Sequence, residues 1–115
     1  MRKYHHLGIP TQEKRPGEVH LEDLKIYVSG FDESPYNIEW VRFEEDAPYP
    51  DLVRTVPHIA FEVENLEQEI EGKKILIEPN SPSQGTTVAF IEDNGAPIEF
   101  VQIEPESGDV EDYKN

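Results

Sequence analysis

The sequence predicts an α+β fold in which paired βαβββ modules form a curved, mostly antiparallel sheet around a cup, with a reduced helix in the first module. Three observations predict it. The segment IEWVRF at 38–43 returns as IEFVQI at 98–103, and HLGI at 6–9 returns as HIAF at 58–61. Short runs of β-branched and aromatic residues, separated by turn residues, follow each histidine segment. Each half therefore begins with a strand that carries a His and ends with a strand that carries a Glu.

The length and charge of the chain restrict its organisation and its partners. At 115 residues it suits one domain. We expect this domain to span 1–103, with a first module at about 4–45 and a second at about 55–103. Residues 104–115 are polar and acidic, a composition typical of a disordered tail. The formal charge of −15 argues against nucleic acid or an anionic membrane as partner, since both select clustered Lys and Arg.

Missing residue types exclude further classes of site. The chain contains no cysteine, which excludes disulfides, thiolate metal ligands and a cysteine nucleophile. Its first residues lack the apolar core of a secretory signal peptide, and no apolar run approaches the length of a membrane span. These features predict a cytoplasmic protein without a membrane segment.

The strands of the first module follow from three apolar runs. Residues 4–9 predict the opening strand, which carries His6. Residues 24–28 and 36–43 are rich in β-branched and aromatic side chains and predict two further strands. The turn residues at 30–35 predict that these two strands form a hairpin.

The helix of the first module is poorly indicated. Residues 11–20 contain Pro16 and Gly17 and show no helical apolar period, so we expect a loop or a single irregular turn there. Residues 44–50 contain two prolines and predict the crossover between the modules.

The second module repeats the plan with a clearer helix. Asn65 can cap this helix, with Gln68 in the reciprocal capping position, and Gly72 can end it. A turn of sequence Asp-Asn-Gly at 93–95 predicts a closing hairpin. The predicted strands are 56–63, 74–77, 87–91 and 96–103, with a loop at 79–85.

Side chains alternate across a strand, and this places four residues of metal-ligand types on one face. They oppose the bulkier apolar side chains, which should form the core beneath the helix. Gly8 and Ala60 leave room on the face that the four would line. His5 directly precedes the first of them, so alternation predicts it on the opposite side. The four residues are His6, Glu39, His58 and Glu99.

Two imidazoles and two carboxylates form a donor set with a definite metal preference. A glutamate inside an apolar strand is costly unless something pairs with it, and a divalent cation would neutralise both glutamates. Mixed nitrogen and oxygen ligands suit Zn, Ni, Co, Mn or Fe better than Ca or Mg. In octahedral geometry two positions remain open for two neighbouring oxygens of a substrate, which predicts Lewis-acid chemistry.

Plainer interpretations compete with this one. Histidines commonly begin strands without binding a ligand, and either glutamate could lie on an exposed face or pair with Lys25 or Arg54. Arg42 and Arg54 are candidate anion anchors at the rim of the cup, or else solvated charges. The equivalent positions of His and Glu in a repeat favour the metal site.

These motifs resemble those of the vicinal oxygen chelate superfamily, which includes glyoxalase I, methylmalonyl-CoA epimerase, extradiol dioxygenases and bleomycin-resistance proteins. The resemblance spans about residues 4–103 and is carried by HLGI at 6–9, IEW at 38–40, PHIAF at 57–61 and GAPIEF at 95–100. It implies the paired-module fold and a divalent metal. The implied ligands, His6, Glu39, His58 and Glu99, are most similar to the glyoxalase I set.

Three alternative functions are compatible with this resemblance. The first is a glyoxalase-like, metal-dependent lyase or isomerase whose small substrate chelates the metal through vicinal oxygens. Glu99 or Glu39 would then act as the catalytic base. The second is a metal-free protein that binds or sequesters a small molecule, as bleomycin-resistance members do. A third is a structural or regulatory role for a module pair whose cup has closed.

The resemblance leaves the assembly open as well. Family members form the cup within one chain or across a dimer, and this chain contains both modules. Sheet edges left exposed by a missing helix favour a homodimer.

Overall fold

The computed structural model describes residues 1–104, and residues 105–115 are not described. Nearly all of the predicted tail, 104–115, therefore lies outside the described residues. The strands are β1 (Lys3–Thr11), β2 (Val19–Leu21), β3 (Ile26–Ser29), β4 (Ile38–Phe43), β5 (His58–Glu62), β6 (Lys74–Ser83), β7 (Thr86–Asp93) and β8 (Ala96–Ile103). The helical segments are a 3-10 turn, η1 (Glu22–Leu24), and two short α-helices, α1 (Asp51–Thr55) and α2 (Leu66–Ile70).

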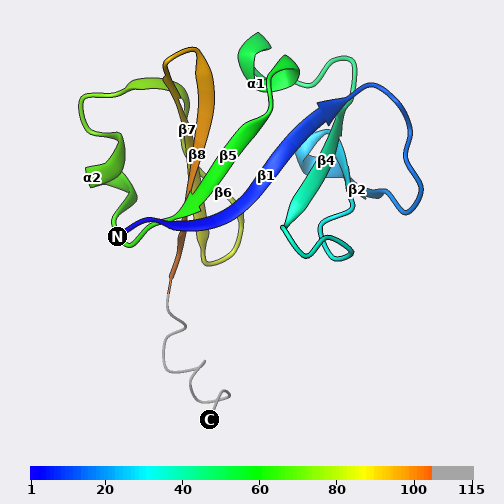
Figure 1. Cartoon of the computed structure of the whole chain (residues 1–115). Coiled ribbons are helices and arrows are strands. Elements are labelled where there is room, and N and C mark those ends of the chain that lie inside the picture. Colours follow the sequence, from blue (N-terminus) through cyan, green and yellow to red (C-terminus); the bar gives the residue numbers. More distant parts are fainter. Residues whose placement is uncertain (105–115) are drawn as a thin grey trace.

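The strands form one curled sheet in the order β2-β3-β4-β1-β5-β8-β7-β6 (Figure 1). In each half the first and last strands pair in parallel, β1 with β4 and β5 with β8, and the other pairs are antiparallel. The two halves join where β1 pairs antiparallel with β5. The predicted α+β fold of two repeated modules in a curved, mostly antiparallel sheet is confirmed.

The second module has a core beneath α2, as the alternation of its strands predicts. Leu66 and Ile70 of α2 form one buried cluster with Ile91 of β7 and Phe100 of β8. The Asn65 side chain accepts a hydrogen bond from the backbone N–H of Gln68 at 3.1 Å, which is the predicted cap. Burial of these apolar side chains stabilises the module by removing their surface from water.

The first module has no α-helix between β1 and β2, in agreement with its reduced helix. Its outer face is instead contacted by charged side chains of the segment between those strands. The Arg15 guanidinium lies 4.2 Å from the ring centroid of Trp40. Glu18 accepts two hydrogen bonds from Arg42, both at 2.8 Å. This segment therefore covers the sheet by cation–π contacts and ion pairing rather than by apolar burial.

The hairpin turns match the predicted turn chemistry. Asn94 and Gly95 both have positive φ, at 54° and 80°, as a two-residue turn with right-handed strand twist requires. Gly30 opens the turn between β3 and β4 with φ of 88°. Both turns bring their strands into the predicted antiparallel pairs.

Several predicted boundaries were wrong. The predicted loop at 79–85 is mostly strand, because β6 runs to Ser83 along the edge of the sheet, where Pro79 and Pro82 are tolerated. The predicted loop at 11–20 ends in β2, which pairs with β3. α1 was not predicted, and the strand predicted from residue 56 begins at His58.

In the described part of the chain, no helix combines the length and the hydropathy that crossing a membrane requires.

Candidate metal centre

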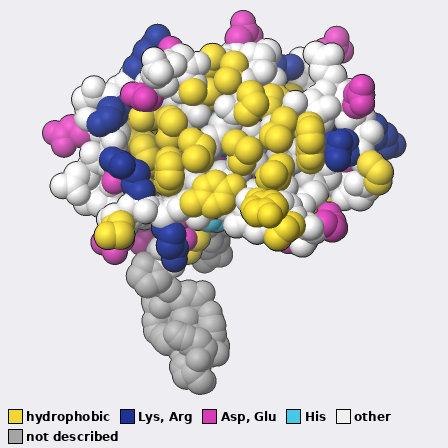
Figure 2. All heavy atoms as spheres, in the orientation of Figure 1, with side chains coloured by type: hydrophobic (Ala, Val, Ile, Leu, Met, Phe, Trp, Pro, Cys, Tyr) yellow, Lys and Arg dark blue, Asp and Glu magenta, His cyan; other side chains and the backbone are white. Residues whose placement is uncertain are grey.

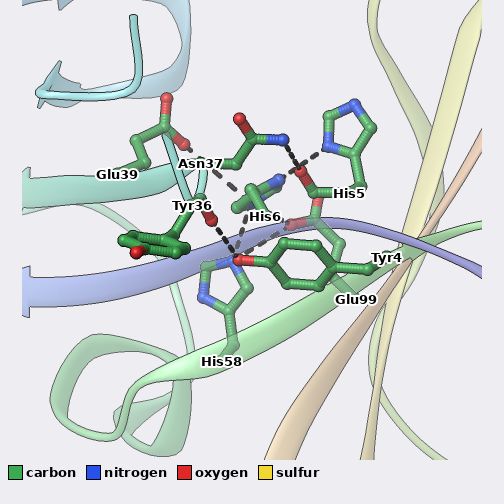
Figure 3. A network of polar contacts seen from close by, with 8 residues as sticks. All are labelled: Tyr4, His5, His6, Tyr36, Asn37, Glu39, His58 and Glu99. Carbon is green, nitrogen blue, oxygen red and sulfur yellow. Dashed lines mark hydrogen bonds and ion pairs between the residues drawn. The ribbon is translucent and has the colours of Figure 1, made fainter. Parts of the chain in front are cut away.

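Strand pairing brings the predicted residues to the concave face of the sheet (Figure 3). On the β1–β5 seam, His6 is opposite Ala60 and Gly8 is opposite His58. The parallel neighbours place Glu99 beside Ala60 and Glu39 beside Gly8. Since paired residues point to the same face, all four side chains approach one another from both modules.

Three of the four form a tight cluster. The Nε2 atoms of His6 and His58 lie 3.3 Å apart. Oε1 of Glu99 lies 3.3 Å from Nε2 of His6 and 3.1 Å from Nε2 of His58. The ligand atoms of these three residues all lie within 4.8 Å of one another, and both histidines are buried.

Glu39 lies at the edge of this cluster. Its Oε1 is 3.9 Å from Nε2 of His6, and its side chain is 25% exposed, compared with 12% for Glu99. The group of residues that could hold a metal ion therefore comprises His6, His58 and Glu99, with Glu39 beside it.

Gly8 makes room for His58. A Cβ at Gly8 would lie 2.7 Å from Nε2 and 2.8 Å from Nδ1 of that ring, closer than real Cβ atoms approach other heavy atoms. The absence of a side chain at Gly8 lets the imidazole of His58 lie over the backbone of β1. Ala60, which is fully buried, has the equivalent position opposite His6.

The charges in the cluster are strongly coupled. Burial opposes ionisation of Glu99, but hydrogen bonds from His58 and His6 outweigh it and lower the pKa of Glu99 to about 2. Burial lowers the pKa of His6, yet its contacts with Glu99 prevail and raise this pKa above its ordinary value. Burial also raises the pKa of Glu39. Glu99 is thus a largely buried carboxylate, 12% exposed, whose negative charge is stabilised by both histidines.

His5 is the residue that the alternation rule misplaced. The pairing of β1 with β5 shifts register between Tyr4 and His6, so His5 is the extra residue of a β-bulge. The bulge turns its ring toward the cluster, where Nδ1 of His5 lies 2.8 Å from Nδ1 of His6. Asn37 donates a hydrogen bond to the carbonyl of His5 at 2.9 Å. The second ring nitrogen of His6 thus has a partner, which fixes the direction of Nε2.

A cavity of about 160 Å³ adjoins the cluster. Besides the four predicted residues, its lining includes Tyr49, Asn80 and Phe90, which sequence reasoning did not select. Tyr49 follows the prolines of the crossover and Asn80 lies on the edge strand β6, so neither has a local sequence signal for a site. Phe90 contacts the ring of His58 edge-on, with centroids 5.0 Å apart.

The donor set fits a divalent metal ion. Two imidazole nitrogens and one carboxylate oxygen are ligands that suit zinc and the neighbouring transition metals, and Glu39 is placed to add a fourth. The buried negative charge of Glu99 and the hydrogen-bonded outer nitrogen of His6 are both features of metal-binding sites. The three residues could therefore hold a divalent metal ion, whose identity they do not define.

No family model and no curated protein matches this chain. Its fold is similar to that of a hypothetical protein, BH1468, from Bacillus halodurans C-125, with a TM-score of 0.64 and 21% identity over 92% of this chain and 97% of that chain. It is also similar to methylmalonyl-CoA epimerase from Mycobacterium tuberculosis, with a TM-score of 0.57 and 17% identity over 90% and 89%. At such identities the likeness shows the fold alone, and this curled eight-stranded sheet is consistent with a fold of the vicinal oxygen chelate type.

Proposed function

We propose that this chain is a glyoxalase-like, divalent-metal-dependent isomerase or lyase whose small substrate chelates the metal through two neighbouring oxygens. One observation carries the proposal: His6 from the first module meets His58 and Glu99 from the second at one point of a largely apolar cup. An uncompensated carboxylate in such a place would be costly, so the arrangement favours a bound cation.

His6, His58 and Glu99 would hold the ion in this proposal, with Glu39 able to join them. A divalent ion bound by three or four protein atoms retains open positions and supplies Lewis-acid polarisation of a carbonyl group. The similarity in fold to an epimerase is consistent with isomerase chemistry.

The remaining side chains would position the substrate and move its proton. Of the two candidate bases, Glu39 is the better placed, because it borders the cup but stands outside the cluster of three. It would accept a proton from a carbon next to the substrate carbonyl. His5 would orient His6, and the apolar wall would exclude water.

Metal binding provides the direct test. The chain, prepared without a histidine tag and freed of metal by a chelator, is titrated calorimetrically with Zn²⁺, Co²⁺, Ni²⁺ and Mn²⁺. We expect one ion per chain, and absorption of the Co²⁺ form would report the coordination number. Glu99→Gln should lose this binding. Glu92→Gln is a matched control, because Glu92 pairs with Lys74 at 3.1 Å outside the cup. Stoichiometric metal in Glu99→Gln would contradict the assignment.

Proton transfer is tested separately from binding. The metal-loaded protein is incubated in D₂O with a panel of small hydroxyketones, and proton NMR follows the exchange of the hydrogen next to the carbonyl. We expect exchange by the unsubstituted chain and a strong reduction in Glu39→Gln with metal still bound. Exchange that is equally fast in Glu39→Gln would assign the base to another group.

The alternative is a metal-free small-molecule binding protein of the bleomycin-resistance type. It is favoured by the contacts of Glu99 with both histidines, which satisfy the buried polar groups without an ion. Ligand binding that is unchanged by chelator, together with a failure to bind any of the four metals, would support this alternative.

We also propose that the chain forms a homodimer. Hydrophobic side chains gather on the face of the sheet where β1 and β5 lie in front, with charged side chains around them (Figure 2). Leu7, Ile9, Ile59 and Phe61 alternate with the residues of the cup on these strands and are only half-buried. Sedimentation velocity at micromolar concentration should give twice the mass of 13.2 kDa, and the monomer mass would refute the proposal.

A further inference from the structure

The wall of the cup is apolar on nearly every side. Strands β3, β4, β6 and β7 each contribute two apolar residues to it, and η1 and α1 each contribute one. The apolar lining residues are Leu24, Ile26, Val28, Val41, Phe43, Val53, Ile77, Pro82, Val88 and Phe90. The polar ones are the cluster residues, Glu39, Tyr49 and Asn80. Four of the six polar lining residues are therefore the residues of the candidate metal site.

Within residues 1–104, neither Lys nor Arg lines this cavity. The two arginines that could have anchored an anion are engaged elsewhere. Arg42 binds Glu18 and stacks on Tyr27, with its guanidinium carbon 4.1 Å from the ring centroid. Arg54 donates a hydrogen bond to the carbonyl of Ala47 at 2.6 Å. An anionic tail inside the cup would thus lose its hydration without gaining a cationic partner.

The charge of the cluster also disfavours an anionic tail on the ligand. Glu39 and Glu99 bring two carboxylates to the base of the cup, so a divalent ion would only balance them. No excess positive charge would remain there to attract a second anionic group on the ligand.

The size of the cavity limits the apolar body of the ligand. Its volume is about 160 Å³. An engineered cavity of roughly 150 Å³ lined by Leu, Ile and Phe, a known case in lysozyme, accommodates benzene. Each methylene buried in such a wall raises affinity by about fourfold. Because this volume also includes the metal-binding end, the cup suits a ligand of about the size of benzene, with only a few carbons beside the chelating oxygens.

We propose that the cup selects uncharged ligands that join two neighbouring oxygens to a small apolar body, and that it discriminates against ligands with an anionic tail. This inference rests on the proposed function for the chelating end, whereas the selectivity against an anionic tail rests on the lining of the cup, which has neither Lys nor Arg and includes two carboxylates whether or not a metal is bound. The proposed preference for uncharged ligands distinguishes this cup from a site that binds thioester or peptide conjugates carrying phosphates or carboxylates.

Two hydroxamates test the selectivity, because they share one chelating group and differ only at the tail. Butanohydroxamic acid ends in a methyl group, and the monohydroxamate of succinic acid ends in a carboxylate. Calorimetry with the metal-loaded chain should show the neutral probe binding at least about tenfold more tightly. Equal affinities, or a preference for the carboxylate, would overturn the inference.

A substitution in the wall of the cup tests whether the preference for the neutral hydroxamate arises there. Ile26 is half-buried on β3, so Ile26→Lys can place an ammonium group at the wall while its stem remains packed. It should raise affinity for the anionic probe about tenfold with the metal stoichiometry unchanged. Ile26→Met has a similar length without charge and should keep the original preference. A lysine variant with unaltered preference would place the discrimination outside this wall.

Failure of the metal site is distinguishable from failure of this inference. If no metal binds, the proposed function fails, and the same two probes are then compared by methyl NMR of the metal-free chain. The neutral probe alone should shift the methyl signals of Val28, Val41 and Val88. Equal shifts with both probes, or none with the neutral one, would refute the selectivity.

Discussion

The two modules cover the outer face of the sheet in different ways, although the strands beneath are repeats. Phe100 of β8 packs under Leu66 and Ile70 of α2. At the equivalent position of β4, Trp40 contacts the guanidinium of Arg15 instead. The same strand position thus receives an apolar helix in one module and a charged segment in the other.

The next outward position shows the same contrast. Gln102 accepts a hydrogen bond from the backbone N–H of Leu66 at 2.7 Å and so holds the first turn of α2. Its repeat equivalent, Arg42, makes two hydrogen bonds to Glu18 of the covering segment. In both modules this position attaches the covering element to the last strand. The comparison teaches that the two repeats share an attachment point, although an apolar helix covers one and a charged segment covers the other.

The modules also differ on the concave face. The carboxylate of the second module, Glu99, lies between both histidines, whereas that of the first, Glu39, lies outside the cluster. If the cluster binds metal, the two repeat positions should respond very differently to the same substitution.

The largest expected effect is on metal affinity. Glu99→Gln should weaken it by more than about 100-fold, and Glu39→Gln by only about tenfold, the size typical of losing an outer partner. Calorimetric titrations of both variants in the same buffer measure the ratio of their metal affinities. Equal losses of metal affinity would show that Glu99 and Glu39 contribute equally to metal binding, which the different positions of the two carboxylates do not predict.

The second effect is on stability. Leu66→Ala, which removes a side chain only 2% exposed, should lower the free energy of unfolding by about 3 kcal/mol. Arg15→Ala removes one cation–π contact at the half-exposed face of the first module and should cost about 0.5–1 kcal/mol. Urea denaturation followed by circular dichroism compares them. A cost for Arg15→Ala as large as that for Leu66→Ala would mean that the charged cover stabilises its module as strongly as the helix does.

The third effect concerns the residue that precedes each histidine. His5 contacts His6, whereas His58 is preceded by Pro57, which has no side-chain N–H. His5→Ala should weaken metal binding by about tenfold, since it removes the partner of Nδ1 in His6. His5→Asn can restore a polar partner and should recover part of the loss. Pro57→Ala, the matched change in the second module, should leave affinity within about twofold. An unchanged metal affinity in His5→Ala would show that His5 does not orient His6.

The smallest effect is a dependence of stability on pH in the first module. Hydrogen bonding to Arg42 lowers the pKa of Glu18 from 4.5 to about 2. The contribution of ionised Glu18 to the free energy of unfolding should therefore be complete above pH 4.5 and disappear as the pH falls toward 2. The difference in unfolding free energy between the unsubstituted chain and Glu18→Gln should be constant from pH 7 to 5 and shrink below pH 4.5. A difference that grew on acidification would contradict the ion pair.

The paired-module fold could be predicted because its signals are local and repeated. Alternation on β4, β5 and β8 depends only on sequence order, and it assigned the concave and outer faces correctly for Glu39, His58 and Glu99. The cap at Asn65 and the turn at Gly95 are likewise properties of a few neighbouring residues.

The rest depends on partners that are distant in sequence. The bulge that turns His5 inward exists only because β1 pairs with β5, so counting residues along β1 could not reveal it. β2 is three residues long and is defined by its pairing with β3. The prolines of β6 indicate a loop locally, but β6 is an edge strand, and Pro79 and Pro82 lie where its pairing with β7 shifts register, so neither interrupts a regular ladder.

The position of the cluster on the β1–β5 seam has a thermodynamic consequence. Each half-chain carries only part of the donor set, with His6 on one side and His58 and Glu99 on the other. An occupant of the cup would therefore bind only when the halves are joined, and it would reinforce that union by mass action. At a free concentration one hundred times its dissociation constant, the gain would be about 2.7 kcal/mol. For a chain with so small a core, saturation of the cup would then raise the free energy needed to separate the two halves.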